Sequence, residues 1–231
     1  MSIDLERYNR QVMLPGMGEE GQEKLSKVSV LVVGAGGLGC PVIQYLTGAG
    51  IGTIGIIDAD DISLTNLQRQ ILYTEEEIGM NKAEVAAKKM AGLNSTVDFK
   101  VYTHFLTEEN AEKLIGAYDI IVGATDNLES RYLINKYTSK LQKPFVHGAV
   151  SDFEGRFSVF NYQGSPSYSD VFPTPPESKG GILGVIGALP GTIGSHMALE
   201  VIKIAAQVGK VSNDGLYIFD GLNSSLMKLK Y

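Results

Sequence analysis

Short apolar runs alternate with amphipathic segments along the first two thirds of the chain. Residues 28–33, 53–57 and 119–124 are almost continuously apolar, which is typical of strands covered on both faces. Residues 97–102 and 144–150 are expected to be further strands, and residues 38–49, 82–91, 108–115 and 127–139 are expected to be helices. Because parallel strands joined by helices need right-handed crossovers, this alternation predicts an α/β fold with a doubly wound, mainly parallel sheet.

The last third has a different pattern. Residues 156–162 and 216–219 are expected to be strands, and residues 226–229 a terminal strand, so that an additional antiparallel portion forms at the C-terminal end. Residues 164–181 are rich in Pro, Ser and Gly and are expected to be a long loop, and a last helix is expected over residues 194–207. Loops of this length in a compact domain are usually functional or mobile. We expect one domain over residues 1–231.

Composition excludes several classes of function. The chain has 231 residues, 20 Lys plus Arg and 26 Asp plus Glu, and a net charge of -6. This acidic balance argues against binding to nucleic acid or to an anionic membrane surface. Residues 180–199 carry no charged side chain, but six glycines, Pro190 and His196 favour a buried loop that leads into a core helix over a membrane span. The first residues, MSIDLERYNR, are charged where a signal peptide is apolar, so a soluble, cytoplasmic protein is expected.

A glycine-rich turn follows the first predicted strand. The sequence GAGGLG places glycines at 34, 36, 37 and 39, between a strand and a helix. The backbone can approach phosphate groups here because four residues lack side chains: Gly34, Gly36, Gly37 and Gly39. The phosphates then lie at the helix N-terminus. Asp58 ends the second strand, where a carboxylate commonly binds ribose hydroxyls. These residues indicate a nucleotide site, and they are compatible with either a dinucleotide or ATP.

Cations farther along the chain favour a triphosphate. Residues 65–68 fit a capping box, which is expected to start a helical turn that carries Asn66, Arg69 and Gln70. Lys82 falls in the first turn of a helix, where a cation opposes the helix dipole by about 0.3–1 kcal/mol, so its presence there makes sense if an anion shares the space. Arg69 can bind phosphate oxygens through two parallel hydrogen bonds. The alternative is that Arg69 and Lys82 are two exposed cations.

Asp126 directly follows the strand at 119–124, in the sequence ATDN. The carboxyl ends of strands in doubly wound sheets are where ligands bind, and a carboxylate there can hold a magnesium ion that bridges nucleotide phosphates. The alternative role of Asp126 is to cap the following helix, with Glu129 completing a capping box. The two roles are compatible.

Read together, these residues resemble the ThiF/MoeB/HesA family of ubiquitin-activating-enzyme-like adenylyltransferases. The resemblance extends over about residues 5 to 230. It rests on RYNRQ at residues 7–11, GAGGLG, Asp58, NLQRQ at residues 66–70, Lys82 and ATDN at residues 124–127. It implies a Rossmann-like domain that forms a homodimer, binds magnesium and ATP, and adenylylates the C-terminal glycine of a ubiquitin-like sulfur carrier that ends in Gly-Gly. Molybdopterin and thiamin biosynthesis both use this chemistry.

The resemblance also implies roles for individual residues. The catalytic residues would be Arg10, Arg69, Lys82 and Asp126, with Asp126 binding magnesium and Arg10 entering the site of the neighbouring subunit. The ATP-binding residues would be Gly34, Gly36, Gly37, Gly39, Asp58, Asn66, Arg69, Gln70, Lys82, Asp126 and Asn127. Residues 1–27 would form a helical arm, residues 28–150 the nucleotide-binding part, and residues 151–231 the carrier-binding and dimer part.

The chain departs from the family at its cysteines. Many members bind a structural zinc ion through two C-x-x-C pairs, and the first pair falls at Ser167 and Asp170 here, so no zinc is expected. The reactive cysteine that many members carry in the loop before the last long helix is also missing. The single cysteine, Cys40, is expected to be inert packing in the first helix. Two alternatives stay open: a non-catalytic nucleotide-binding scaffold, and an NAD-dependent oxidoreductase.

Overall fold

An eight-stranded sheet runs through the part of the chain that the computed structural model describes, residues 4–174 and 184–231. The strands are β1 (Ser29–Val33), β2 (Thr53–Ile57), β3 (Asp98–Tyr102), β4 (Ile120–Gly123), β5 (Phe145–Ser151), β6 (Glu154–Phe160), β7 (Leu216–Asp220) and β8 (Ser225–Leu229). The helices are α1 (Leu5–Val12), α2 (Gly18–Lys27), α3 (Gly39–Ala49), α4 (Lys82–Leu93), α5 (Glu108–Gly116), α6 (Leu128–Leu141), α7 (Tyr168–Val171) and α8 (Ala188–Ala206), with short 3-10 turns η1 (Leu64–Asn66) and η2 (Glu75–Glu77).

The strand order is β3-β2-β1-β4-β5-β6-β7-β8. Strands β1 to β5 pair in parallel, and β5 to β8 pair antiparallel. Strands β1 and β4 lie side by side in the middle and are buried along nearly their whole length, as their apolar runs predict. The predicted doubly wound sheet with an antiparallel C-terminal portion is therefore confirmed. The chain leaves β1 toward one edge and β4 toward the other, which makes the gap between them a topological switch point.

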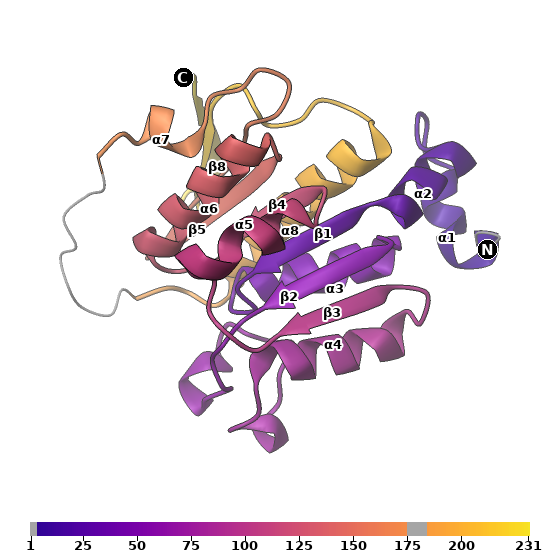
Figure 1. Cartoon of the computed structure of the whole chain (residues 1–231), viewed down its shortest axis with the longest axis horizontal. Helices are drawn as coiled ribbons and strands as arrows, with labels where there is room; N and C mark the ends of the chain where they lie inside the picture. The colour runs from indigo at the N-terminus through magenta and orange to yellow at the C-terminus, as the bar shows by residue number, and fades with distance from the viewer. Residues whose placement is uncertain (1–3, 175–183) are drawn as a thin grey trace.

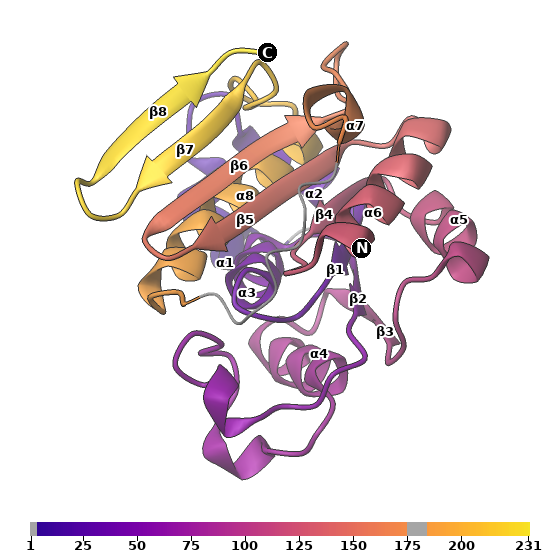
Figure 2. The same cartoon turned by 90° about the vertical axis from the view of Figure 1, so that its left-hand side faces the viewer.

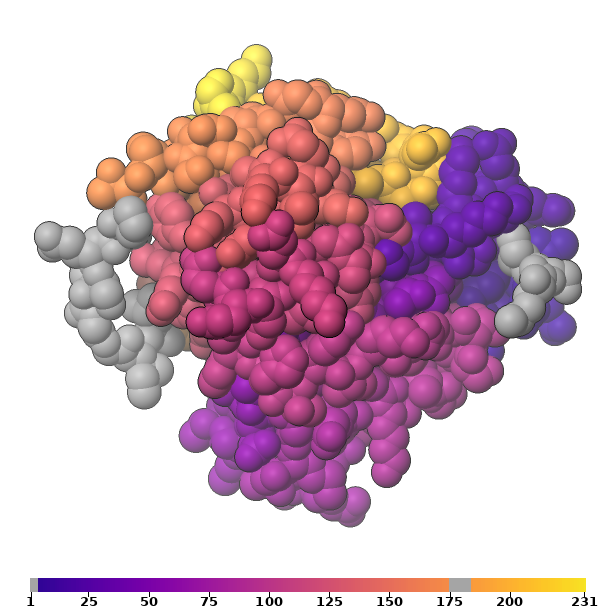
Figure 3. Space-filling model, in the orientation of Figure 1, coloured from indigo at the N-terminus to yellow at the C-terminus, as the bar shows by residue number. Residues whose placement is uncertain are grey.

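Helices cover both faces of the sheet. Figure 1 shows α5 and α6 in front of the parallel strands, with α3 and α8 behind them, and Figure 2 shows the same layers from the side. The larger apolar cluster lies on the α3, α4 and α8 face, and the smaller one lies under α5 and α6. In the space-filling view of Figure 3, the magenta to red part of the chain, which includes α5 and α6, covers the near face. The glycine-rich loop and the ends of β1 and β4 are thereby held between two packed layers.

The last helix begins earlier than the predicted residue 194. Helix α8 starts at Ala188 and includes Pro190 in its first turn, where proline is tolerated. The glycines of this stretch weaken the helical pattern in the sequence, but the packing needs Gly194: a Cβ atom there would lie 2.5 Å from the carbonyl oxygen of Leu38. Close contact between α3 and α8 therefore explains the glycine. In the described residues, no helix is long and apolar enough to cross a membrane.

Strand β6 is shifted two residues toward the N-terminus relative to the predicted range of 156–162. It ends at Phe160, because Asn161 adopts a left-handed conformation with φ of 55°. At its other end, Asp152 has φ of 51° and forms the tight turn from β5. Local turn geometry, which the apolar pattern does not reveal, sets these boundaries.

The first 27 residues contain α1 and α2. Asp4 caps α1 by accepting a hydrogen bond from the backbone N–H of Arg7 at 3.1 Å. The buried Tyr8 accepts a hydrogen bond from the side-chain amide of Asn94, just before β3, and its ring packs over Gly50, just before β2. Helix α1 therefore lies at the edge of the sheet where the parallel strands begin.

Candidate nucleotide-binding site

The glycine-rich loop lies at the switch point between β1 and β4. The backbone N–H of Gly34 donates to Ile57 at 2.9 Å, and φ of Gly34 is 99°. A Cβ atom at Gly34 would lie 2.6 Å from the carbonyl oxygen of Ala124. Glycine is required here because the loop presses directly against the end of β4. Among the described residues, no side chain caps the start of α3. The N–H of Cys40 already donates to the carbonyl oxygen of Gly36 at 2.9 Å and Pro41 has no N–H, so an anion at this helix N-terminus would be bound by the N–H groups that precede Cys40.

Asp58 is tied to this loop. One carboxylate oxygen accepts a hydrogen bond from the N–H of Ala35 at 2.7 Å, and the other accepts from the N–H of Asp60 at 2.9 Å. Burial raises the pKa of Asp58, and the hydrogen bond from Ala35 acts against this shift. Each oxygen retains a further lone pair, so the carboxylate can still accept hydrogen bonds from ribose hydroxyls.

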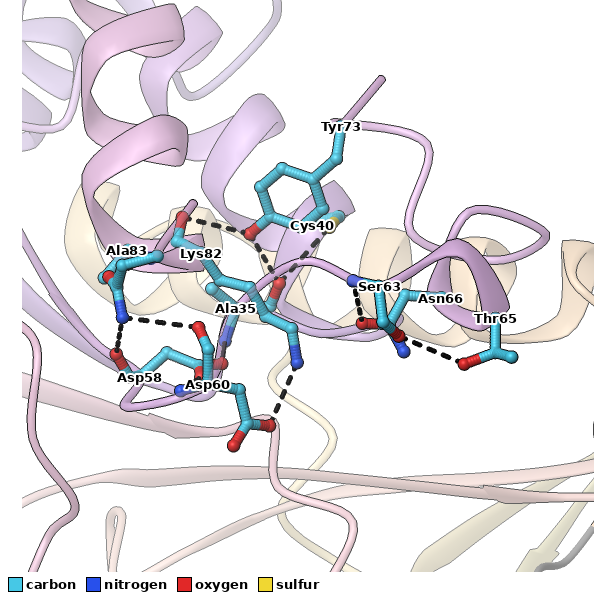
Figure 4. A network of polar contacts seen from close by, with 11 residues as sticks. Ala35, Cys40, Asp58, Asp60, Ser63, Thr65, Asn66, Tyr73, Lys82 and Ala83 are labelled. Carbon is cyan, nitrogen blue, oxygen red and sulfur yellow. Dashed lines mark hydrogen bonds and ion pairs between the residues drawn. The ribbon is translucent and has the colours of Figure 1, made fainter. Parts of the chain in front are cut away.

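Lys82 is the first residue of α4, and it is not an exposed cation. Its side chain is 6% exposed, and its Nζ lies 3.0 Å from Oδ2 of Asp60, as Figure 4 shows. The reading of Lys82 as a solvent-exposed charge is therefore wrong. Sequence reasoning missed Asp60, although its position two residues after Asp58, at a strand end, was a usable signal.

The turn that carries Asn66 is capped differently from the prediction. The capping box is formed by Ser63 and Asn66, and the box expected over residues 65–68 is wrong. Oδ1 of Asn66 accepts from the N–H of Ser63 at 3.2 Å, which leaves its Nδ2 as the group that can donate to a ligand. Ser63 has an extended backbone conformation just before the turn, so the cap is Ser63, two residues before the predicted cap at Thr65.

Arg69 and Gln70 line the glycine-rich loop. A Cβ atom at Gly37 would lie 3.5 Å from Cγ of Arg69, and one at Gly36 would lie 3.5 Å from Nε2 of Gln70. Gln70 is buried, and its Oε1 has no hydrogen-bond partner among the described residues. A buried polar atom without a partner is costly, so this oxygen marks a place where a donor from a ligand or a water molecule fits.

The turn after β4 presents Asp126 to solvent. The cap of α6 is Asn127, whose Oδ1 accepts from the N–H of Ser130 at 2.8 Å. The alternative role of Asp126 as helix cap is therefore wrong, and its exposed carboxylate is left for other contacts. Arg131, which sequence reasoning missed, donates from Nη2 to the carbonyl oxygen of Thr125 at 3.2 Å and so holds the turn.

Arg10 is the one predicted site residue that the described structure keeps apart from the others. It is exposed on α1, at the edge where the parallel strands begin. The glycine-rich loop, Asp58 and Asp126 all follow the opposite ends of those strands. Within one chain, Arg10 therefore does not reach the site.

The positions of the first missing cysteine pair cap a helix, and the single cysteine of the chain is buried elsewhere. Ser167 and Asp170 form a capping box on α7, with the N–H of Ser167 donating to Asp170 at 2.8 Å. Cys40 is buried in α3, and its Sγ donates to the carbonyl oxygen of Ala35. Burial raises the pKa of the Cys40 thiol to about 12, which keeps it protonated and unreactive.

Similarity to known proteins agrees with this geometry. The ThiF family model matches residues 8–231. The chain is 46% identical to the adenylyltransferase and sulfurtransferase MOCS3 of Anopheles gambiae, over 98% of this chain and 52% of that protein. It is 43% identical to the sulfur carrier protein adenylyltransferase of Thermus thermophilus, over 98% of this chain and 87% of that protein. The chain thus spans about half the length of the MOCS3 relatives.

Solved structures share the fold. The crystal structure of E. coli MccB superimposes with a TM-score of 0.88 at 21% identity, over 99% of this chain and 70% of that one. The structure of PaaA gives a TM-score of 0.84 at 21% identity, over 98% of this chain and 73% of that one. With a family model that matches almost its whole length, the chain belongs to the ThiF family.

Proposed function

We propose that this chain is an ATP-dependent adenylyltransferase that activates the C-terminal glycine of a small sulfur-carrier protein. The observation that carries the proposal is the set of charged residues around the glycine-rich loop Gly34–Gly39. Asp58 accepts a hydrogen bond from the loop and Arg69 lies against it. Lys82 is paired with Asp60, which donates its N–H to Asp58, and Asp126 follows β4, whose end contacts Gly34. The proposal is supported by two relatives named as adenylyltransferases, which are 46% and 43% identical to the chain over the aligned residues.

Different residues of the site bind different parts of ATP. The N–H groups of the glycine-rich loop and the start of α3 bind phosphate oxygens, and Asp58 binds the ribose. Arg69 and Lys82 place positive charge beside the phosphates, and Asn66 and Gln70 add polar contacts. The acceptor carboxylate and the phosphates are all anions, so the site's main contribution is to hold like charges together in a reactive arrangement. The chain supplies no nucleophile, because the carboxylate of the carrier attacks the α-phosphate and pyrophosphate departs.

Asp126 suits a magnesium ion. Its side chain is exposed, it follows the end of β4 that contacts Gly34, and it is not used to cap α6. Mg²⁺ typically takes one or two protein carboxylates, with substrate phosphates and water completing its coordination, so a single carboxylate is a suitable donor set. The ion would neutralise charge on the phosphates. Asn127, the next residue, would lie beside the nucleotide.

The carrier and the dimer complete the proposal. The proposed partner is a ubiquitin-like protein whose Gly-Gly end extends to the α-phosphate. Residues 164–181 are the segment we assign to covering this tail; residues 175–181 of it lie outside the described residues. A homodimer would bring Arg10 of one subunit to the site of the other, since Arg10 does not reach its own site. Residues 151–231 would contribute the carrier-binding and dimer surfaces.

The test is ATP–pyrophosphate exchange in the presence of magnesium and a panel of Gly-Gly-ended carriers. We expect exchange that requires the intact carrier tail, and loss of exchange when the terminal glycine is removed. Binding of ATP without exchange across the panel would instead favour the non-catalytic scaffold. Binding of NADH but not ATP would favour the oxidoreductase, against which membership of the ThiF family already argues.

A further inference from the structure

The hydroxyl group of Tyr73 lies between the glycine-rich loop and the start of α4. Tyr73 is buried, and its hydroxyl donates to the carbonyl oxygen of Ala35 at 2.7 Å. The same hydroxyl lies 3.2 Å from the carbonyl oxygen of Lys82. Figure 4 shows both contacts, with the tyrosine ring entering from the segment after Gln70. One side chain therefore connects the glycine-rich loop to the first residue of α4.

Both segments are also fixed on their other sides. The peptide of Ala35 donates its N–H to Asp58, while its carbonyl oxygen accepts from Tyr73 and from Cys40. Lys82 directs its ammonium group to Asp60. Burial raises the pKa of Tyr73, so the phenol is protonated and can donate at neutral pH.

We propose that Tyr73 is a positioning residue that sets the spacing between the glycine-rich loop and Lys82, and so serves binding of the triphosphate rather than of the nucleoside. The inference rests on the proposed function, because it assigns Tyr73 to the same ATP site. Tyr73 touches no reacting atom in this assignment. It acts through the carbonyl groups of Ala35 and Lys82, whose positions determine where the loop N–H groups and the ammonium group lie.

The experiment compares wild type with Tyr73→Phe, which removes one hydroxyl and keeps the ring. Calorimetric titrations measure binding of ATP and of adenosine, without a carrier, so that turnover is not needed. We expect the affinity for ATP to fall about tenfold, which corresponds to one buried hydrogen bond, and the affinity for adenosine to change by less than about twofold. An equal fall for ATP and adenosine would overturn the proposal and leave Tyr73 a purely structural role.

Tyr137→Phe is the control. The ring of Tyr137 is buried, and its hydroxyl donates to the carboxylate of Glu108 at 2.8 Å, on the far side of the sheet, where the Glu108 side chain is exposed. We expect it to lower the melting temperature by less than Tyr73→Phe does and to leave the affinity for ATP unchanged. A similar loss of ATP affinity in both variants would mean that general destabilisation causes it, which would overturn the proposal.

A double-mutant cycle with Lys82→Met tests the route of action. If Tyr73 acts partly through Lys82, the loss caused by Tyr73→Phe shrinks when the ammonium group is absent. Additive losses would overturn the proposal. The outcomes also distinguish the proposed function from the role of Tyr73. If the wild type does not bind ATP, the proposed function is contradicted. If the wild type binds ATP no better than Tyr73→Phe, only the role of Tyr73 is contradicted.

Discussion

The ammonium group of Lys82 lies 3.0 Å from the carboxylate of Asp60, so a cation that we propose to bind a phosphate already has an anionic partner. The lysine side chain is 6% exposed, whereas the aspartate is 59% exposed. Removing the aspartate leaves a nearly buried charge without its partner, and removing a partner in this way is destabilising.

Asp60→Asn is therefore expected to lower the free energy of unfolding by about 1–2 kcal/mol, less than for a fully buried pair because Asp60 is exposed. ATP should stabilise this variant more than it stabilises wild type, since a phosphate replaces the lost partner. Thermal melts with and without ATP measure both effects, and Asp61→Asn, one residue along, is the control. Equal stability of wild type and Asp60→Asn would contradict the expectation.

The second prediction separates two neighbouring residues, Asp126 and Asn127. Asp126→Ala should reduce carrier-dependent exchange by at least about 100-fold, because the proposed magnesium ligand is lost. It should change the free energy of unfolding by less than about 0.5 kcal/mol, because the carboxylate does not cap α6. Asn127→Ala removes the actual cap and should cost about 1 kcal/mol. The reverse order of stability in denaturant titrations would show that the caps are misassigned.

The third prediction concerns pH. Burial lowers the pKa of His147 well below 6.5, with the positive charges of Arg131 and Arg156 acting in the same direction. Because the unfolded state then binds more protons than the folded state below about pH 6.5, stability from this residue is present above that pH and is lost as the pH falls. The loss is at most about 1.4 kcal/mol per pH unit.

His147→Phe keeps a ring among Phe145, Phe160 and Tyr168, which surround it, and removes the titration. The variant should therefore show a shallower decline of unfolding free energy between about pH 6.5 and pH 5. Part of the slope should remain, because burial also lowers the pKa of His196. An unchanged slope in denaturant titrations at several pH values would show that His147 is not held neutral in the folded protein.

The fourth prediction tests whether Arg10 acts in trans. Arg10→Ala and Asp126→Ala should each be inactive alone. Mixed after subunit exchange, they should recover up to about one quarter of wild-type activity, because half of the dimers are mixed and each has one site with both residues intact. No recovery, with exchange verified by mass spectrometry, would place Arg10 outside the partner's site.

Most of the fold follows from local patterns. The runs at β1, β2 and β4 are apolar throughout because both faces are covered, and their neighbours have helical periodicity, so each could be recognised alone. A related argument from the sequence locates three features at one edge of the sheet: the glycine-rich loop, Asp58 and Asp126. Each follows directly on a strand, and parallel strands bring their carboxyl ends to one edge of the sheet.

Close helix packing, local backbone conformation and individual side-chain contacts could not be read in this way. Gly194 weakens the helical signal of α8, and the close approach of Leu38, just before α3, explains it. Ser63 and Asn66 form the cap of η1 because of the backbone conformation at Ser63, which the Thr65 pattern conceals. Arg131 gains its contact with Thr125 only once α6 is packed beside the turn.

The sequence by itself determined the order of the elements, the edge of the sheet where a nucleotide would bind, and the charged groups available there. These features depend on residue type and on spacing along the chain. Tertiary structure alone decided that the side chain of Lys82 is buried against Asp60. It also decided that the Tyr73 hydroxyl contacts the carbonyl groups of both Lys82 and Ala35. Both results depend on how closely segments far apart in the sequence pack together, and burial and hydrogen-bond partners are set by that packing.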